Sequence, residues 1–272
     1  MALGSIGGFL AAIFSNFVNL GLWMPVGVLE GAADDVLESA DVVVTASGTA
    51  TVQTAIHERP MVIVGGGGWS AQACRDIRAF IEANGLPVCA SFRNQDLFDN
   101  RHPNYAGDLG VGVGPALGKR LKASDLIIAV GPRLGEATTG GYTLFDLPVP
   151  KQKLVHVHAS AEELGRVYQA TLPINSGMQA FAAAAKAMKP VDSARWKNTV
   201  AESHAEYLDN IKPGPLPGTV NMGEVIKWLN GRLPEDAIVT NGAGNYAAFL
   251  HRFFQYKGFK TQLELLSGTD DV

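Results

Sequence analysis

Two strand-like runs decide the fold class of this sequence: Met61-Val-Ile-Val64, and Asp125-Leu-Ile-Ile-Ala-Val130, which is apolar after its first residue. Neither run alternates apolar with polar residues, which is the pattern of strands covered on both faces. Each run is followed at once by a glycine, Gly65 in one case and Gly131 in the other. The sequence therefore predicts an α/β fold, in which helices wind doubly around a mostly parallel sheet.

The chain around these two runs keeps the same rhythm of strands and helices. Ser70 is expected to cap a helix that places Ala73, Ile77 and Phe80 on one face and closes at Asn84. Residues 93–113 read as irregular. Further strands are predicted over residues 86–92, 153–158 and 172–175, and further helices over residues 115–123, 161–168 and 178–188.

Composition divides the chain into five segments. Residues 1–30 are an apolar lead-in, 31–64 a strand-helix-strand piece, and 61–188 the central α/β domain. Residues 189–218 are predicted to be a linker, because Pro213-Gly-Pro-Leu-Pro217 is stiff, although the stretch around 196–209 is helix-like. Residues 219–272 then begin a second α/β domain that is incomplete, with a helix over 221–233, a strand over 237–240 and a helix over 245–254.

The lead-in carries no charge before Glu30. A membrane span needs about 20 apolar residues, which residues 8–29 approach. Asn16, Asn19 and Pro25 interrupt the run, however, and no basic segment precedes it as in a secretory signal. The sequence therefore favours a buried or poorly folding lead-in, with a membrane span or signal as the alternative.

Charge and cysteine content exclude several classes of protein. The net charge is −4, and no basic cluster is longer than Lys119-Arg120, which argues against a nucleic-acid partner. Cys74 and Cys89 are too few for a disulfide framework or a four-cysteine metal site. They fit a reducing compartment, so a cytoplasmic location is predicted.

Glycine-rich turns are the candidate binding sites, because backbone amides between a strand and a helix can approach a phosphate. One such turn is Gly65 to Gly68, and another contains Arg133, which could clamp an anion or form a surface ion pair. A third turn between a predicted strand and a predicted helix is Thr240-Asn-Gly-Ala-Gly-Asn-Tyr246. A fourth, Ser47 to Thr51, is rich in hydroxyl groups and not in glycine. At each glycine turn a plain tight turn is the competing interpretation.

Other polar residues do not form a recognisable catalytic set. His156 and His158 share one face of a predicted strand, where a cleft-lining or core role is favoured over a metal pair. Asp96, Asp99 and Asp108 lie in one irregular stretch, but nothing assigns them as acid and base. No catalytic residue and no metal ligand is therefore predicted from the residues alone.

Several segments together resemble the central domain of acetolactate-synthase-like thiamine-diphosphate enzymes. They are residues 59–69 (RPMVIVGGGGW), 83–88 (ANGLPV), 98–110 (FDNRHPNYAGDLG), 124–135 (SDLIIAVGPRLG) and 154–158 (LVHVH). Residues 240–246 (TNGAGNY) and 251–254 (HRFF) are similar to the opening of the diphosphate-binding domain in the same family. The resemblance spans roughly residues 60–268.

This resemblance implies an enzyme of three α/β domains that uses thiamine diphosphate and Mg²⁺ on 2-oxo acids such as pyruvate. In the family the cofactor performs the carbanion chemistry and the protein orients it. The turn with Gly242, Gly244, Asn245 and Tyr246 would touch the diphosphate. Homo-oligomers and a small-molecule 2-oxo acid substrate are also implied.

Some family members bind FAD near positions that match Gly66, Gly67 and Arg133. Here the residues after Arg133 are Gly135-Glu136-Ala137, and His158 stands where the family usually has aspartate, so FAD stays an open alternative. The activating glutamate of a first domain and the Gly-Asp-Gly metal motif are absent from the sequence. The chain is therefore expected to be a fragment that is inactive alone.

Residues 31–64 resemble a different family instead. Residues 46–55 (ASGTATVQTA) and 59–64 (RPMVIV) are similar to the donor-binding half of lipid-A-disaccharide synthase, a UDP-sugar glycosyltransferase. The two likenesses overlap at residues 59–64, as if two sequences had been joined there. Two alternatives therefore stay open beside the leading hypothesis: a glycosyltransferase remnant, and a non-catalytic binding or assembly domain.

Overall fold

The computed structural model describes residues 59–110, 112–242 and 244–264. The predicted lead-in, the predicted elements within residues 31–58 and the Ser47 to Thr51 turn lie outside these described residues. Among the described residues, no helix combines the length and the apolar character that crossing a bilayer requires.

Six parallel strands form the main sheet, in the order β3-β2-β1-β4-β5-β6. β1 and β4 pair at its centre, and every residue of both strands is buried, as their unbroken apolar runs predict. The doubly wound, mostly parallel α/β class is confirmed. The strands are β1 (Pro60–Val64), β2 (Val88–Ala90), β3 (Tyr105–Asp108), β4 (Leu126–Val130), β5 (Lys153–His158) and β6 (Leu172–Asn175).

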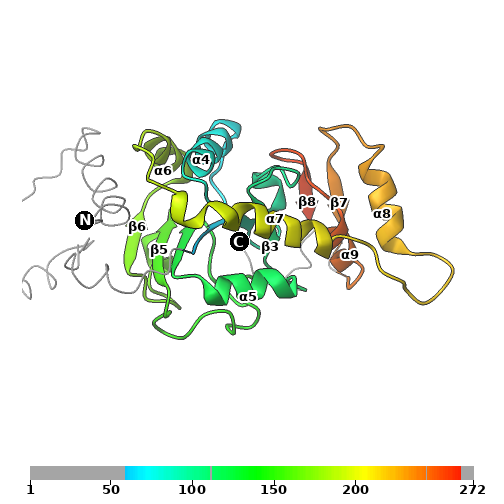
Figure 1. Ribbon diagram of the computed structural model, residues 1–272, viewed down its shortest axis with the longest axis horizontal. Coiled ribbons are helices and arrows are strands. Elements are labelled where there is room, and N and C mark those ends of the chain that lie inside the picture. The colour runs from blue at the N-terminus through cyan, green and yellow to red at the C-terminus, as the bar shows by residue number, and fades with distance from the viewer. Residues whose placement is uncertain (1–58, 111, 243, 265–272) are drawn as a thin grey trace, which may run out of the picture.

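Helices cover both faces of this sheet (Figure 1). α4 (Ala71–Ala83) and α6 (Met178–Lys186) lie on one face, where they pack with Val62 and Val64 of β1. α5 (Pro115–Ala123) covers the other face, where it packs with Met61 and Ile63. Alternate residues of one strand thus point into two separate cores, which is the period-two geometry of a strand.

Local sequence explains where these helices begin. The Ser70 hydroxyl caps α4 by accepting a hydrogen bond from the Ala73 amide at 3.1 Å, as predicted. Pro115 occupies the first turn of α5, where no amide hydrogen is needed. Both helices therefore match their predicted ranges closely.

Three predictions of local structure are wrong. The strand predicted over residues 86–92 is only the three-residue β2, and β3 lies in the stretch predicted to be irregular. The helix predicted over 161–168 is a single 3₁₀ turn, η2 (Ala161–Glu163). Gly165, with a φ of 82°, turns the backbone out of a helical path soon after.

The helix-like part of the predicted linker is α7 (Lys197–Asn210), which follows the 3₁₀ turn η3 (Ala194–Trp196). α7 packs on β3 and α5, and Tyr207 lies in the same core as α4 and α6. The Trp196 indole donates a hydrogen bond to the Asn84 carbonyl at 3.1 Å. Part of the predicted linker therefore contributes to the core of the central sheet.

A smaller C-terminal unit follows, with the predicted helix, strand and helix in order. Its elements are α8 (Met222–Asn230), β7 (Val239–Asn241), α9 (Ala247–Phe253) and β8 (Gln262–Glu264). β7 and β8 pair in parallel as a separate two-stranded sheet, seen in orange and red in Figure 1. Four residues form its buried core: Ile226, Phe253, Phe254 and Tyr256.

A loop of the central sheet forms several hydrogen bonds with the C-terminal unit. We name residues 95–101, which include the 3₁₀ turn η1 (Gln95–Leu97), the clamp. The Asp96 carboxylate accepts hydrogen bonds from the amides of Thr261 at 3.1 Å and Gln262 at 3.3 Å. Asn100 and Tyr256 exchange two hydrogen bonds of 2.9 Å, one to the Asn100 side chain and one from its backbone amide. The C-terminal unit is thus attached to the connection between β2 and β3.

Candidate binding site at the switch point of the sheet

The order of the strands reverses between β1 and β4, so the connections after these two strands leave toward opposite faces. In open α/β sheets a crevice forms at this point, outside the carboxyl ends of the strands, and ligands bind there. The turn Gly65 to Gly68 follows β1, and Gly131 to Arg133 follows β4. The structure therefore brings together the predicted residues Gly66, Gly67 and Arg133.

Main chain packs against main chain at the floor of this crevice. A Cβ atom added to Gly66 would lie 2.0 Å from the Gly131 carbonyl oxygen, and one added to Gly131 would lie 2.3 Å from the Gly65 carbonyl oxygen. Gly66 and Gly131 also have positive φ values, 67° and 88°, which favour glycine. These two glycines are therefore required by the contact between the loops.

The outer part of the first turn is open. A Cβ atom added to Gly67 or Gly68 would meet no atom within 4 Å. Trp69 stabilises the turn, because its buried indole donates a hydrogen bond to the Gly65 carbonyl at 2.8 Å. The open backbone precedes the first turn of α4, whose amides carry partial positive charge. This geometry suits the close approach of an anionic group.

Arg133 is half exposed at the edge of the crevice. Its guanidinium lies 3.5 Å from the Glu163 carboxylate, which also accepts a hydrogen bond from Arg166 at 2.7 Å. The Glu163 side chain is more buried than those of Arg133 and Arg166, and its carboxylate lies close to both guanidinium groups. The surface ion pair that the sequence left open is thus present, and Glu163 shares it between two arginines.

His156 lies on β5 beside the second loop. Its Nε2 is 3.0 Å from the Pro132 carbonyl oxygen, while its buried Nδ1 has no hydrogen-bond partner. Burial lowers the pKa of His156, so the ring is neutral at pH 7 and its protonated nitrogen donates to Pro132. The rings of His156 and His158 are 6.1 Å apart. Within the described ranges, no three His, Cys, Asp or Glu side chains converge as a metal site.

The other predicted turn lies in the C-terminal unit, between β7 and α9. The Tyr246 side chain folds back over it, so a Cβ atom on Gly242 would lie 2.6 Å from the Tyr246 hydroxyl and one on Gly244 2.2 Å from the ring. Tyr246 is 61% exposed, and Asn245 is also exposed. The Asn241 side-chain oxygen is buried without a partner, beside the Gly242 carbonyl that its amide group contacts.

The predicted site residues therefore form two groups, one in each unit. Gly66, Gly67 and Arg133 lie at the switch point of the main sheet, and Gly242, Gly244, Asn245 and Tyr246 lie between β7 and α9. Asp96 and Asp99 both belong to the clamp, where Asp96 accepts from the C-terminal unit and Asp99 pairs with Arg101 at 2.8 Å. Sequence reasoning noted both aspartates without a role and missed Glu163, because their partners become neighbours only in the folded chain.

The central part of the chain matches a known family of protein domains. The family described as "Thiamine pyrophosphate enzyme, central domain" matches residues 53–185. This span contains all six strands of the main sheet and nearly all of α6.

The chain is also similar to acetolactate synthases. It is 27% identical over 214 residues to the acetolactate synthase large subunit of Corynebacterium glutamicum, covering 76% of this chain and 33% of that protein. It is 27% identical over 192 residues to the isozyme 2 large subunit of Escherichia coli, covering 70% and 33%. A probable large subunit of Methanocaldococcus jannaschii is 24% identical over 209 residues, covering 74% and 35%. The aligned part of the chain spans about a third of the length of these relatives.

Proposed function

Residues 53–185 belong to the thiamine pyrophosphate enzyme central-domain family, and on this premise we propose that the chain is part of a thiamine-diphosphate-dependent enzyme. The relatives are acetolactate synthases, so the proposed substrate is a 2-oxo acid such as pyruvate. The proposed reaction class is carboligation or decarboxylation, in which the cofactor supplies the carbanion chemistry and the protein orients it.

One observation carries this proposal. The family match coincides with a complete six-stranded sheet whose order reverses between β1 and β4, where glycine turns leave open backbone. The match to the Corynebacterium glutamicum protein covers 76% of this chain, a longer stretch than residues 1–185. Similarity therefore continues beyond α6 toward the C-terminal unit that carries the second turn.

The turn from Gly242 to Tyr246 is the proposed contact for the diphosphate. Gly242 and Gly244 have no side chains to obstruct it, and the exposed Tyr246 ring is the only group that covers them among the described residues. The buried, unpartnered Asn241 oxygen is a hard ligand of the kind that Mg²⁺ prefers. No carboxylates converge there within the described chain, so these residues do not by themselves form a Mg²⁺ site.

We expect no turnover by this chain alone, since no set of metal ligands converges among its described residues. A homo-oligomer is proposed by analogy with the family. A cytoplasmic location is proposed because Cys74 and Cys89 are both free thiols. FAD remains a proposal for the switch point at Gly66, Gly67 and Arg133. The glycosyltransferase alternative finds no support in these comparisons.

Calorimetric titration of the full chain with three ligands tests the proposal. The ligands are thiamine diphosphate with Mg²⁺, FAD, and UDP-GlcNAc. Asn245→Ala changes an exposed residue at the second turn, and Gly67→Ala adds a methyl group to the open part of the first turn. Each variant serves as the matched control for the other.

We expect binding of thiamine diphosphate that Asn245→Ala weakens and Gly67→Ala leaves unchanged. FAD binding at the switch point would show the opposite pattern. Binding of UDP-GlcNAc without binding of thiamine diphosphate would overturn the proposal in favour of a glycosyltransferase. No heat with any ligand would also overturn it, in favour of a non-catalytic binding or assembly domain.

A further inference from the structure

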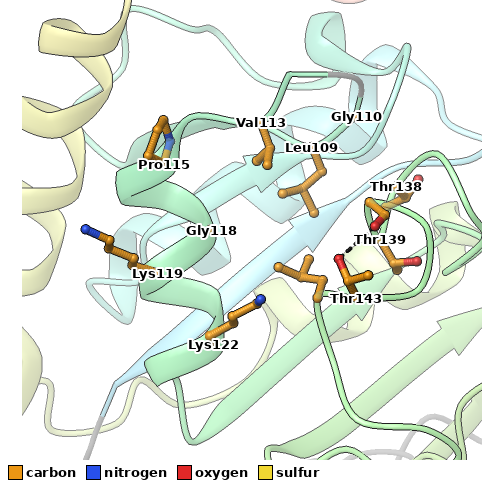
Figure 2. A pocket seen from close by; sticks show the side chains of 12 residues that line it. Leu109, Gly110, Val113, Pro115, Gly118, Lys119, Lys122, Thr138, Thr139 and Thr143 are labelled. Carbon is orange, nitrogen blue, oxygen red and sulfur yellow. Dashed lines mark hydrogen bonds between the residues drawn. The ribbon is translucent and has the colours of Figure 1, made fainter.

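A pocket of about 250 Å³ lies between α5 and the loop 138–144 that follows β4 (Figure 2). The connection from β4 to β5, residues 131–152, contains no helix, although α5 covers the neighbouring part of the same sheet face. The pocket occupies space beside α5 at this position. None of the switch-point glycines and none of the predicted cofactor contacts lines it.

The inner wall of the pocket is aliphatic. Leu109 and Leu144 are buried members of the core beneath α5, and Val113 packs against the same core. Water in such a pocket has few polar partners, so an apolar group that displaces it gains free energy. The inner wall is therefore suited to a short hydrocarbon chain.

Gly118 keeps the helical side of the pocket open. It lies inside α5, where glycine is less favourable than alanine. A Cβ atom at this position would meet only a Val113 methyl group, at 4.0 Å. Neither close packing nor a positive φ requires glycine at this position. The absence of a side chain instead leaves room in the pocket.

The mouth of the pocket carries one inward-pointing cation. Figure 2 shows the Lys122 ammonium directed toward the loop that bears Thr143, whereas the Lys119 ammonium points away from it. Within the described chain, Lys122 has no carboxylate partner. The Thr143 hydroxyl donates its hydrogen bond to the Gly140 carbonyl at 2.7 Å. Lys122 therefore provides a cationic donor that a ligand anion in the pocket would meet.

We propose that this pocket binds a short aliphatic monocarboxylate. Its hydrocarbon chain lies against Leu109, Val113 and Leu144, and its carboxylate pairs with the Lys122 ammonium at the mouth. A charge-assisted hydrogen bond at the mouth and apolar contact inside are the two interactions the pocket offers. The volume limits the ligand to a small molecule, since typical ligand pockets measure about 300–1,000 Å³. This site is independent of the proposed thiamine diphosphate function.

Ligand-detected NMR titration of the full chain with hexanoate and with 1-hexanol tests the proposal. The two probes share the chain and differ in charge. Lys122→Ala and Lys119→Ala remove the same charge from the same helix, one pointing into the pocket and one away from it. Gly118→Leu introduces a good helix former whose side chain fills the pocket, and thermal unfolding verifies that each variant is folded.

We expect hexanoate to bind about tenfold more tightly than 1-hexanol, and Lys122→Ala to remove that preference. Lys119→Ala should leave both affinities unchanged, and Gly118→Leu should abolish both. Equal effects of the two lysine variants would overturn the proposal, as would equal affinities of the two probes for the unaltered chain. Retained hexanoate binding in a folded Gly118→Leu variant would also place the ligand elsewhere and overturn it.

Discussion

The central sheet and the C-terminal unit are built from the same kinds of elements, but they bury very different amounts of apolar surface. β1 and β4 are buried along their whole length, while no residue of β7 is fully buried. The C-terminal core has four residues, and Trp228, Ile238 and Leu263 are each more than half exposed beside it. Since hydrophobic burial is the main favourable term in folding, the central sheet should be much the more stable of the two.

The C-terminal unit adds to its small core the polar contacts with the clamp and the packing of Phe259 against the core of the central sheet. Gln95, Asp96 and Asn100 are all buried, and each hydrogen-bonds to a residue between 251 and 262. Buried hydrogen bonds are costly to leave unmade, so a few of them can hold a unit whose own core is small. The difference teaches that one unit is self-supporting and the other is supported by its neighbour.

The largest effect should come from a cavity in the central sheet. Ile63→Ala removes a fully buried side chain from β1 and is expected to lower the free energy of unfolding by about 2–5 kcal/mol. Both units should lose structure together, since the C-terminal unit relies on the clamp. Thermal unfolding followed by circular dichroism measures this. Ile238→Ala, at a residue 64% exposed, is the matched control and should change stability by less than about 0.5 kcal/mol. Equal effects at the two positions would contradict the comparison.

The next effect should be confined to the C-terminal unit. Asn100→Ala removes the acceptor of the Tyr256 amide and the donor to the Gln95 and Phe98 carbonyls, all within buried structure. Leaving a buried group unpaired costs about 1–3 kcal/mol. Hydrogen exchange should therefore accelerate over residues 222–264 and stay unchanged in β1 and β4.

The exposed Asn245 offers the control for that experiment, since Asn245→Ala should leave exchange unchanged throughout. Faster exchange across the central sheet in Asn100→Ala would show that the two units unfold as one.

A smaller, pH-dependent effect is expected at Asp96. Burial raises the pKa of this carboxyl, although the backbone amides that it accepts from partly offset the shift. Because its pKa is higher in the folded chain than in the unfolded chain, Asp96 stabilises the folded state most at low pH. That contribution is lost as pH rises from about 4, the unfolded value, through the raised folded value.

Asp96→Asn should remove this pH dependence, because its amide oxygen can still accept from Thr261 and carries no charge. Exchange in β8 measured between pH 4 and pH 7, corrected for intrinsic rates, tests this. An unchanged pH profile in the variant would assign the dependence to another group.

The smallest effect should come from the exposed ion pair between Arg101 and Glu235. The two side chains meet at 2.7 Å, but they are 42% and 72% exposed. Exposed pairs contribute little and are screened by salt. Glu235→Gln should therefore leave the melting temperature of the chain unchanged, and any residual effect on exchange should disappear at 1 M NaCl. A large loss of protection in the C-terminal unit would show that this exposed pair, and not the buried residues of the clamp, provides the attachment.

Local sequence predicted the elements that are determined locally. The apolar runs of β1 and β4, the Ser70 cap and the range of α5 each depend on a few neighbouring residues, and each prediction is confirmed. β3 was missed because it is four residues long and contains Gly107, whose φ of 123° is unusual in a strand.

The candidate site was only partly predictable for the same reason. The glycine turns could be placed at the carboxyl ends of strands, because strand order in doubly wound sheets follows general rules. The contact between Asp96 and Thr261 joins residues 165 positions apart, and the Arg133 pair with Glu163 depends on how a short turn is placed. No periodicity in a single sequence records such contacts.

The close approach of the Gly66 and Gly131 loops has a consequence for mutational scans of this chain. A scan that counts tolerated substitutions would score both positions as essential on steric grounds alone, in the presence or absence of any ligand. Gly67, one residue further on, has neither a steric neighbour nor a positive φ, so intolerance there would report occupancy of the crevice rather than its construction. The ratio of the two sensitivities therefore provides an internal standard for separating binding from folding.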